Sequence, residues 1–256
     1  MVSLLEMLPP IERLRGFRLY GAGRRFVDLW QCGGAAILGH KPVNVVRDLK
    51  NAAERGLFAP FPNAAARRFT KALDRLFPGK AFKVYQDWSA VPGYKSLPVW
   101  RPFCFPESGG VYSGETAAAF RPILPFPSAP AVIVCEMESE YPDGGFLPPF
   151  LLAAATRAIY DLLAEPERGI MRFKRIKDAF KQPLTLSNWR MDGIYIRPVW
   201  ADAGEEWAKV FRCFLDSGFL LPPSPLDPLI LPGELSQGEE NSLANLLSLH
   251  AADYTI

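Results

Sequence analysis

Side chains that could carry out catalysis are few and widely separated in this sequence. The two histidines are His40, in a glycine-rich stretch, and His250, near the C-terminus, and neither is accompanied by an acid or a nucleophile at the spacing of a known motif. The sequence also lacks the Gly-x-Ser-x-Gly motif of serine hydrolases. We therefore do not predict hydrolase chemistry, and we interpret His40 as a residue that stabilises a turn or lies in the core.

A run of carboxylates is the second group that could do chemistry. Glu136, Glu138, Glu140 and Asp143 offer the oxygen atoms that a hard cation such as Ca²⁺ binds. No histidine accompanies them, and the run ends in a Pro-Asp-Gly-Gly turn. We interpret the run as a solvated loop and predict no metal site.

The composition favours a globular protein and argues against two classes of partner. The chain has 256 residues, of which 49% are hydrophobic, and a formal net charge of +2. Lys and Arg are scattered along it, so we predict no nucleic-acid partner. No apolar run reaches the roughly 18 residues that a membrane helix needs, so we predict no membrane partner and a cytoplasmic location. The four cysteines are widely spaced, which indicates reduced, buried thiols.

The elements that must position these side chains are clearest near the N-terminus. Residues 26–30 alternate large apolar side chains about Asp28, which predicts a half-buried strand. We predict that this strand is the second strand of a hairpin. Gly33 and Gly34 then let the backbone turn or approach another segment closely before Gly39 and His40. We predict that this glycine turn is required structurally.

The rest of the chain alternates predicted helices and strands around a proline-rich middle. Apolar residues recur at helical spacing in residues 43–56, 64–77, 150–164, 205–216 and 238–249, and strands are predicted at 82–85, 131–136, 193–196 and 229–231. Ser236 and Glu239 have the spacing of a capping box at the start of the last helix. Prolines and glycines crowd residues 88–130, which predicts short extended pieces.

Several of these motifs resemble the N-terminal segment of class III aminotransferases, including the glutamate-semialdehyde aminomutases. They are Arg-Arg-Phe-Val-Asp-Leu at 24–29, Gly-Gly at 33–34 and Ile-Leu-Gly-His at 37–40. The family signature reads Leu-Gly-His, any residue, His-Pro, any residue, Val-Val. It is matched here without a gap by Leu38, Gly39, His40, Val45 and Val46, whereas Pro42 and Val43 stand where the family has His-Pro.

The resemblance implies a fold-type I enzyme architecture of mixed α/β class. We expect a sheet with packed helices similar to the aminotransferase small domain, with residues 88–130 as a Pro-rich central insert. Because both ends of the chain co-fold in that family, we predict a single domain, residues 1–256, in which segments 1–87 and 131–256 share one core. The C-terminal part, with its strand, helix 205–216 and Pro-rich turn, resembles the second half of that small domain.

The residues that bind pyridoxal phosphate (PLP) in the family are not recognisable here. After the strand at 82–85 the family has Ser-Gly-(Ser or Thr)-Glu-Ala, whose amides hold the cofactor phosphate, whereas this chain has Gln-Asp-Trp-Ser-Ala at 86–90. Ser-Gly-Glu-Thr-Ala at 113–117 has Glu and Thr transposed and follows a loop, so we interpret it as helix capping or coincidence. Lys95, the only lysine between Lys83 and Lys174, lies in a context that does not match the family's, and it is the candidate for a cofactor lysine.

The resemblance also implies a homodimer, because fold-type I enzymes are typically dimers. We predict that the interface uses residues 33–62, in which the apolar, Pro-stiffened stretch at 57–62 contributes Phe58 and Phe61. The alternative is that both phenylalanines fold back under the helix at residue 64 as ordinary core.

Two functions from different classes follow from this sequence. The leading hypothesis is a degenerate, non-catalytic relative of aminotransferases that lost the cofactor domain, binds no cofactor and acts through binding or assembly. The alternative is a reduced but active PLP-dependent aminotransferase or aminomutase-like enzyme that uses Lys95 or a lysine of a partner chain. The sequence does not identify the ligand.

Overall fold

The structure, a computed structural model, describes residues 4–59, 61–93, 97–104, 117–121, 124, 129–136, 141–165, 173–181, 188–200 and 205–252. Two compact units are formed, one by Met1–His40 with Glu167–Ile256 and one by Lys41–Pro166. Folding of the chain as a single domain stays a prediction. The predicted mixed α/β class is confirmed, with the described strands in three small sheets.

The first unit contains a four-stranded sheet built from both ends of the chain. Its order is β1 (Arg13–Arg15), β2 (Arg18–Gly21), β3 (Arg24–Asp28) and β9 (Phe219–Leu220). The predicted hairpin is confirmed, since β2 and β3 pair antiparallel across a turn in which Ala22 and Gly23 have positive φ. β9 pairs parallel with β3, placing Phe219 beside Val27. This pairing makes the N-terminal strands depend on the C-terminal part of the chain.

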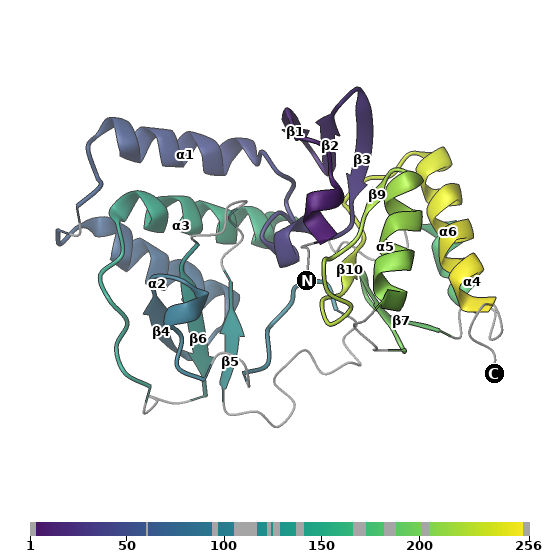
Figure 1. Ribbon diagram of the computed structural model, residues 1–256. Coiled ribbons are helices and arrows are strands. Elements are labelled where there is room, and N and C mark those ends of the chain that lie inside the picture. Colours follow the sequence, from purple (N-terminus) through teal and green to yellow (C-terminus); the bar gives the residue numbers. More distant parts are fainter. Residues whose placement is uncertain are drawn as a thin grey trace. The chain divides into compact units, whose positions relative to one another are not determined.

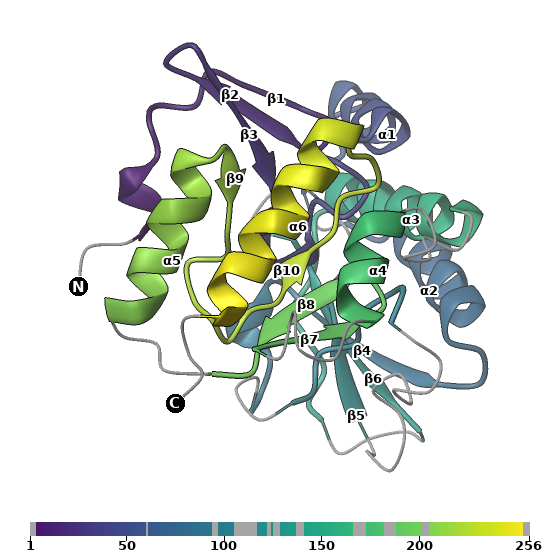
Figure 2. The same ribbon diagram turned by 90° about the vertical axis from the view of Figure 1, so that its right-hand side faces the viewer.

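A second sheet and three helices complete the first unit. The sheet has the order β10 (Leu229–Ile230), β8 (Tyr195–Pro198), β7 (Trp189–Asp192). The helices are α4 (Lys174–Lys181), α5 (Glu205–Asp216) and α6 (Gln237–Ala252), and Figure 2 shows α4 beside α6. Helix α5 buries Trp207, Phe211 and Phe214 at helical spacing, as its apolar periodicity predicted. A short 3₁₀ turn, η1 (Leu4–Met7), precedes β1.

The start of α6 is held by a capping box and by an arginine from β2. The Ser236 hydroxyl accepts the backbone N–H of Glu239, and the Glu239 carboxylate accepts the backbone N–H of Ser236, as the sequence predicted. Arg18 donates two further hydrogen bonds to the two carboxylate oxygens of Glu239, at 3.0 and 2.8 Å. Glu239 is 9% exposed, and Nη2 of Arg25 lies 3.2 Å from its Oε1 atom. These contacts tie the N-terminal strands to the last helix.

Three helices form one layer of the second unit, and α3 lies between the other two (Figure 1). They are α1 (Val43–Glu54), α2 (Ala64–Leu76) and α3 (Pro149–Ala164), close to the predicted bounds. The side chain of Asn63 caps α2 by accepting the N–H of Ala65. The buried residues recur at the predicted helical spacing, so amphipathicity explains the packing of this layer.

The sheet of the second unit is antiparallel throughout its described strands. Its order is β4 (Ala81–Tyr85), β6 (Ala131–Cys135), β5 (Ala117–Phe120). All five residues of the central strand β6 are buried, which explains its continuous apolar sequence. Within the Pro-rich segment, the described pairing outside β5 is one isolated bridge between Val99 and Ala119. None of the helices that the structure describes combines the length and hydropathy needed to cross a bilayer.

Candidate functional site

The predicted glycine turn contains a buried acid–histidine pair. Asp28, at the end of β3, is 1% exposed, and its Oδ2 atom lies 2.7 Å from Nε2 of His40. Its Oδ1 atom accepts the backbone N–H groups of Trp30 and Gln31, each at 2.8 Å. The alternating apolar pattern about Asp28 did not indicate that Asp28 itself is buried. Burial of the carboxylate is tolerated because two backbone N–H groups and the His40 ring contact its oxygen atoms.

The turn after Asp28 has an unusual backbone. Gln31, Cys32, Gly33 and Gly34 all have positive φ, at 50°, 52°, 69° and 99°, within the short 3₁₀ element η2 (Gln31–Gly34). Left-handed conformations are costly for residues with a Cβ atom, so Gln31 and Cys32 are strained. The hydrogen bonds that Asp28 accepts oppose this strain by fixing the start of the turn.

This turn has the chemistry of a structural cluster rather than that of a nucleophile. Burial, together with the Asp28 charge, raises the pKa of the Cys32 thiol to about 11, so the thiol is protonated at neutral pH. His40 also donates its backbone N–H to the carbonyl of Gly16, at 2.8 Å. Gly39 packs against the same segment, because a Cβ atom there would lie 3.2 Å from that carbonyl oxygen. His40 therefore anchors the turn to the preceding hairpin.

Replacing either turn glycine by alanine is expected to destabilise the protein. At φ of 69° and 99°, the added Cβ atom should cost about 1 kcal/mol in Gly33→Ala and in Gly34→Ala. Gly238→Ala is the matched control, since Gly238 lies in helix α6 with open space around it and should gain stability on substitution. Melting temperatures of the three variants test this, and unchanged values for both turn variants would contradict it.

The turn after β4 is filled by a carboxylate of the chain itself. Asp87 caps the short 3₁₀ element η3 (Trp88–Ala90): its Oδ1 atom accepts the N–H groups of Ser89 at 2.8 Å and Ala90 at 3.1 Å. The Ser89 hydroxyl donates to the same oxygen at 2.6 Å. Chiefly this hydroxyl, with the two amides, lowers the pKa of Asp87, so Asp87 is ionised at neutral pH. A phosphate would meet a negative charge here, and the described residues of this turn do not fit PLP.

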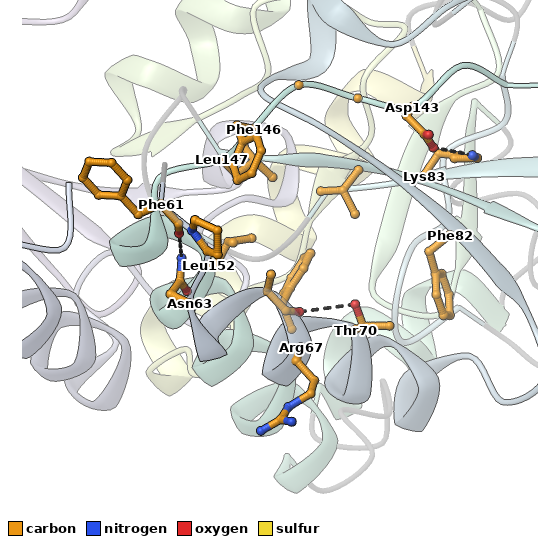
Figure 3. Close-up of a pocket in the computed structure, with 16 residues that line it drawn as sticks. Phe61, Asn63, Arg67, Thr70, Phe82, Lys83, Asp143, Phe146, Leu147 and Leu152 are labelled. Carbon is orange, nitrogen blue, oxygen red and sulfur yellow. Dashed lines mark hydrogen bonds and ion pairs between the residues drawn. The ribbon is translucent and has the colours of Figure 1, made fainter. Parts of the chain in front are cut away.

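A pocket of about 580 Å³ lies in the second unit between α2, β4 and residues 143–147. Phe69 and Leu152 contribute buried apolar surface, whereas Phe61 and Phe146 are 73% and 65% exposed. Figure 3 shows Phe61 and an ion pair between Lys83 and Asp143 at opposite ends of the pocket in that view. The volume falls in the range typical of small-molecule sites.

The wall formed by residues 142–147 is fixed to β4 by several contacts. The Tyr85 hydroxyl donates to the carbonyl of Pro142 at 2.7 Å, and the Gln86 amide donates to the carbonyl of Phe146 at 3.4 Å. Gly144 lies so close to β4 that an added Cβ atom would lie 1.6 Å from the carbonyl oxygen of Val84. Only glycine permits this approach, so the wall is part of the folded unit.

The structure brings some of the predicted residues together and leaves others apart. Gly33, Gly34, Gly39 and His40 share the turn of the first unit. Phe61 lines the pocket of the second unit, and Phe58 is 56% exposed and packs edge-to-face on Phe150. Neither phenylalanine is buried under α2, so the alternative in which both are core is wrong. Lys95 and the segment 113–116 lie outside the described residues.

The carboxylate run is only partly described. Glu136 pairs with Lys80 and Asp143 with Lys83, each at 2.5 Å, whereas Glu138 and Glu140 lie outside the described residues. Where the structure describes side chains, no three His, Cys, Asp or Glu residues gather as metal ligands would. Two of the four carboxylates thus have lysine partners.

Sequence reasoning missed the pocket and the role of Asp28. The pocket residues come from three distant segments, and their periodicity indicates only a helix and a strand. The signals that were present are Gly144 and Gly145, which permit a close backbone approach, and the exposed Phe146 that follows them. For Asp28, the signal was the Asp-x-x-Gln spacing ahead of a glycine turn, which suits a side chain that accepts local backbone N–H groups.

No protein-family model matches this chain. An uncharacterized protein of Treponema pallidum (strain Nichols) is 28% identical over 292 aligned residues, covering 90% of this chain and 91% of that protein. An uncharacterized protein of Borreliella burgdorferi is 26% identical over 262 residues, covering 96% and 92%. The chain therefore has relatives of similar length whose names carry no function.

Solved structures of aminotransferases have the same fold. Acetylornithine aminotransferase of Elizabethkingia anophelis matches with a TM-score of 0.67 at 11% identity, over 99% of this chain and 98% of that chain. Ornithine delta-aminotransferase of Plasmodium falciparum gives 0.66 at 12%, over 96% and 94%. A glutamate-1-semialdehyde aminomutase of Pseudomonas aeruginosa gives 0.66 at 13%, over 94% and 87%. At these identities the similarity establishes the fold alone.

Proposed function

We propose that this chain is a degenerate relative of the PLP-dependent aminotransferases that acts in the cytoplasm through binding or assembly rather than through PLP catalysis. The observation that carries this proposal is the turn after β4. In the resembled family the amides of this turn hold a phosphate, whereas here the Asp87 carboxylate accepts the N–H groups of Ser89 and Ala90. A carboxylate held there competes with an anionic cofactor for the same donors and repels it.

The topology of the second unit supports the same proposal. A fold-type I cofactor domain is built on a parallel sheet with crossover helices, and each such βαβ unit takes about 30 residues. The described strands of the second unit instead pair antiparallel, in the order β4-β6-β5. The alternative function, a reduced but active PLP enzyme, keeps Lys95 as its candidate nucleophile.

Addition of equimolar PLP to the purified protein is expected to give only the absorbance of free PLP. Borohydride reduction followed by peptide mapping should then find no lysine labelled above the background of surface lysines. Lys95→Ala is the control, because its spectrum should equal that of the wild type. A band that saturates at one PLP per chain, is fixed by borohydride onto Lys95 and is absent from Lys95→Ala would establish the alternative function.

We also propose that the protein is a homodimer whose interface includes Phe58 and Phe61. Both rings are more than half exposed. Phe58 lies after the end of α1, and Phe61 lies shortly before the start of α2. Exposed aromatic side chains that are close in sequence commonly mark protein interfaces. A second copy of this chain is the partner that the resemblance implies.

Sedimentation should therefore show a dimer for the wild type and a folded monomer for the double variant Phe58→Asp, Phe61→Asp. Burying two charges in the interface disfavours association, whereas the folded monomer already exposes both positions to water. Leu249→Asp, at a position that is 63% exposed on α6, is the matched control and should remain dimeric. A monomeric wild type would rule out the dimer.

A further inference from the structure

The pocket of the second unit has an apolar body and one charged end. Its walls include Phe69, Leu147 and Leu152, each of which is at most 7% exposed, and the exposed Phe146 also lines it. Water in such a pocket contacts apolar side chains, so an apolar ligand chain placed there removes apolar surface from water. The lining favours a hydrophobic ligand body.

The charged end favours an anionic head group. Lys83 extends from β4, and its side chain is 22% exposed, whereas its partner Asp143 is 88% exposed; their atoms Nζ and Oδ1 are 2.5 Å apart. A ligand carboxylate that replaces Asp143 releases that side chain to water at little cost, because exposed ion pairs contribute little to stability. A ligand cation would instead have to displace a half-buried lysine that is fixed on a strand. The pair therefore discriminates in favour of carboxylates.

The pocket is formed before any ligand arrives. Gly144 lies against Val84, and the Tyr85 hydroxyl holds Pro142, so the wall that carries Asp143 and Phe146 is already positioned. A preformed wall reduces the ordering cost of binding. Arg67 also lines the pocket, but its guanidinium points away from the Lys83–Asp143 pair in Figure 3, so Lys83 alone is assigned to the head group.

We propose that this pocket binds an apolar monocarboxylate, with its alkyl or aryl chain against Phe69, Leu147 and Leu152 and its carboxylate on Nζ of Lys83. The assignment rests on the proposed binding role and names the ligand class. It involves neither the Asp87 turn nor Lys95, so its outcome is independent of the PLP titration.

Calorimetric titration of the full chain with decanoate and with decyltrimethylammonium tests the head-group preference. Decanoate is expected to bind at one site with a dissociation constant in the millimolar range or tighter. Decyltrimethylammonium, with the same chain and the opposite charge, should bind at least 10-fold more weakly. Equal or tighter binding of the ammonium compound would overturn the proposal, as would the absence of any decanoate binding at about 10 mM.

Four variants locate the site. Lys83→Gln should weaken decanoate binding about 10-fold, and Asp143→Asn should strengthen it severalfold, because the competing carboxylate is gone. Lys80→Gln is the matched control: Lys80 lies just before β4, is 24% exposed and pairs with Glu136 at 2.5 Å, but it does not line the pocket. Thr70→Trp, at an exposed position of α2 that lines the pocket, should block binding without unfolding the protein, as its melting curve will show.

Each result has a defined meaning. Equal affinities of Lys83→Gln and Lys80→Gln, or full binding by a folded Thr70→Trp protein, would place decanoate elsewhere and overturn the proposal. If decanoate fails to bind and PLP gives no protein-bound band, the ligand assignment falls while the non-catalytic function stands. A PLP band on Lys95 overturns the function whatever decanoate does.

Discussion

Asp28→Ala is expected to lower the free energy of unfolding by about 3 kcal/mol or more, which is the largest loss of stability that we expect from a single substitution in this chain. The buried carboxylate accepts two backbone N–H groups and faces His40, and alanine leaves all three without this partner. The loss falls on a turn in which Gln31 and Cys32 already have positive φ, so the strain of the backbone is no longer opposed.

Urea denaturation of two further variants separates the causes. Asp28→Asn keeps an oxygen for the two amides but removes the charge beside His40, so it should cost less than Asp28→Ala. Asp48→Ala is the matched control, because Asp48 pairs only loosely with Arg47, at 3.5 Å on the surface, and should change the free energy by less than about 0.5 kcal/mol. An Asp28→Ala protein as stable as the Asp48→Ala protein would contradict the structural role of the turn.

The second large effect is expected at the start of α6 and depends on pH. Burial alone would raise the pKa of Glu239. Hydrogen bonds from Arg18 and from the backbone of Ser236, with the charge of Arg18, outweigh burial and lower this pKa to about 2 from an ordinary value of 4.5. A carboxyl whose folded-state pKa is depressed stabilises the protein above the unfolded-state value. This stabilisation is lost as the pH falls from about 4.5 towards 2.

Glu239→Gln should therefore cost about 2 kcal/mol at pH 7, and the difference from the wild type should shrink as the pH falls below 4.5. Glutamine can still reach back to the N–H of Ser236, so the variant removes mainly the charge. Glu234→Gln is the control: Glu234 also contacts Arg18 but is 67% exposed, and the effect should be small. Free energies of unfolding measured from pH 7 to pH 3 test both statements. A Glu239→Gln difference that stays constant with pH would refute the coupling.

Local patterns in the sequence predicted most helices and several strands. Amphipathic spacing predicted α1, α2, α3 and α5 to within about two residues at each end, because burial of one helix face determines where apolar residues recur. The capping box at Ser236 and Glu239 was also correct, since it depends on residues three positions apart. Such features need no knowledge of the rest of the chain.

Long-range contacts could not be predicted in the same way. The parallel pairing of β3 with β9 joins Val27 to Phe219, and the contact of Arg18 with Glu239 spans a similar distance in sequence. The pocket likewise combines α2, β4 and residues 143–147, which no periodicity links. The burial of Asp28 was not predicted because an acidic residue within an alternating strand ordinarily faces water, and only the folded turn supplies its partners.

The first unit, built from both ends of the chain, has a consequence for synthesis on the ribosome. Arg18 is added to the nascent chain 221 residues before Glu239, which at typical elongation rates is an interval of roughly 10 to 45 s. Val27 and Leu29 lack their β9 and β10 neighbours throughout that time, while Lys41–Pro166, a continuous segment, has all its own contacts available much earlier. The nascent N-terminal hairpin is thus the part of this chain that most needs protection from aggregation before translation ends.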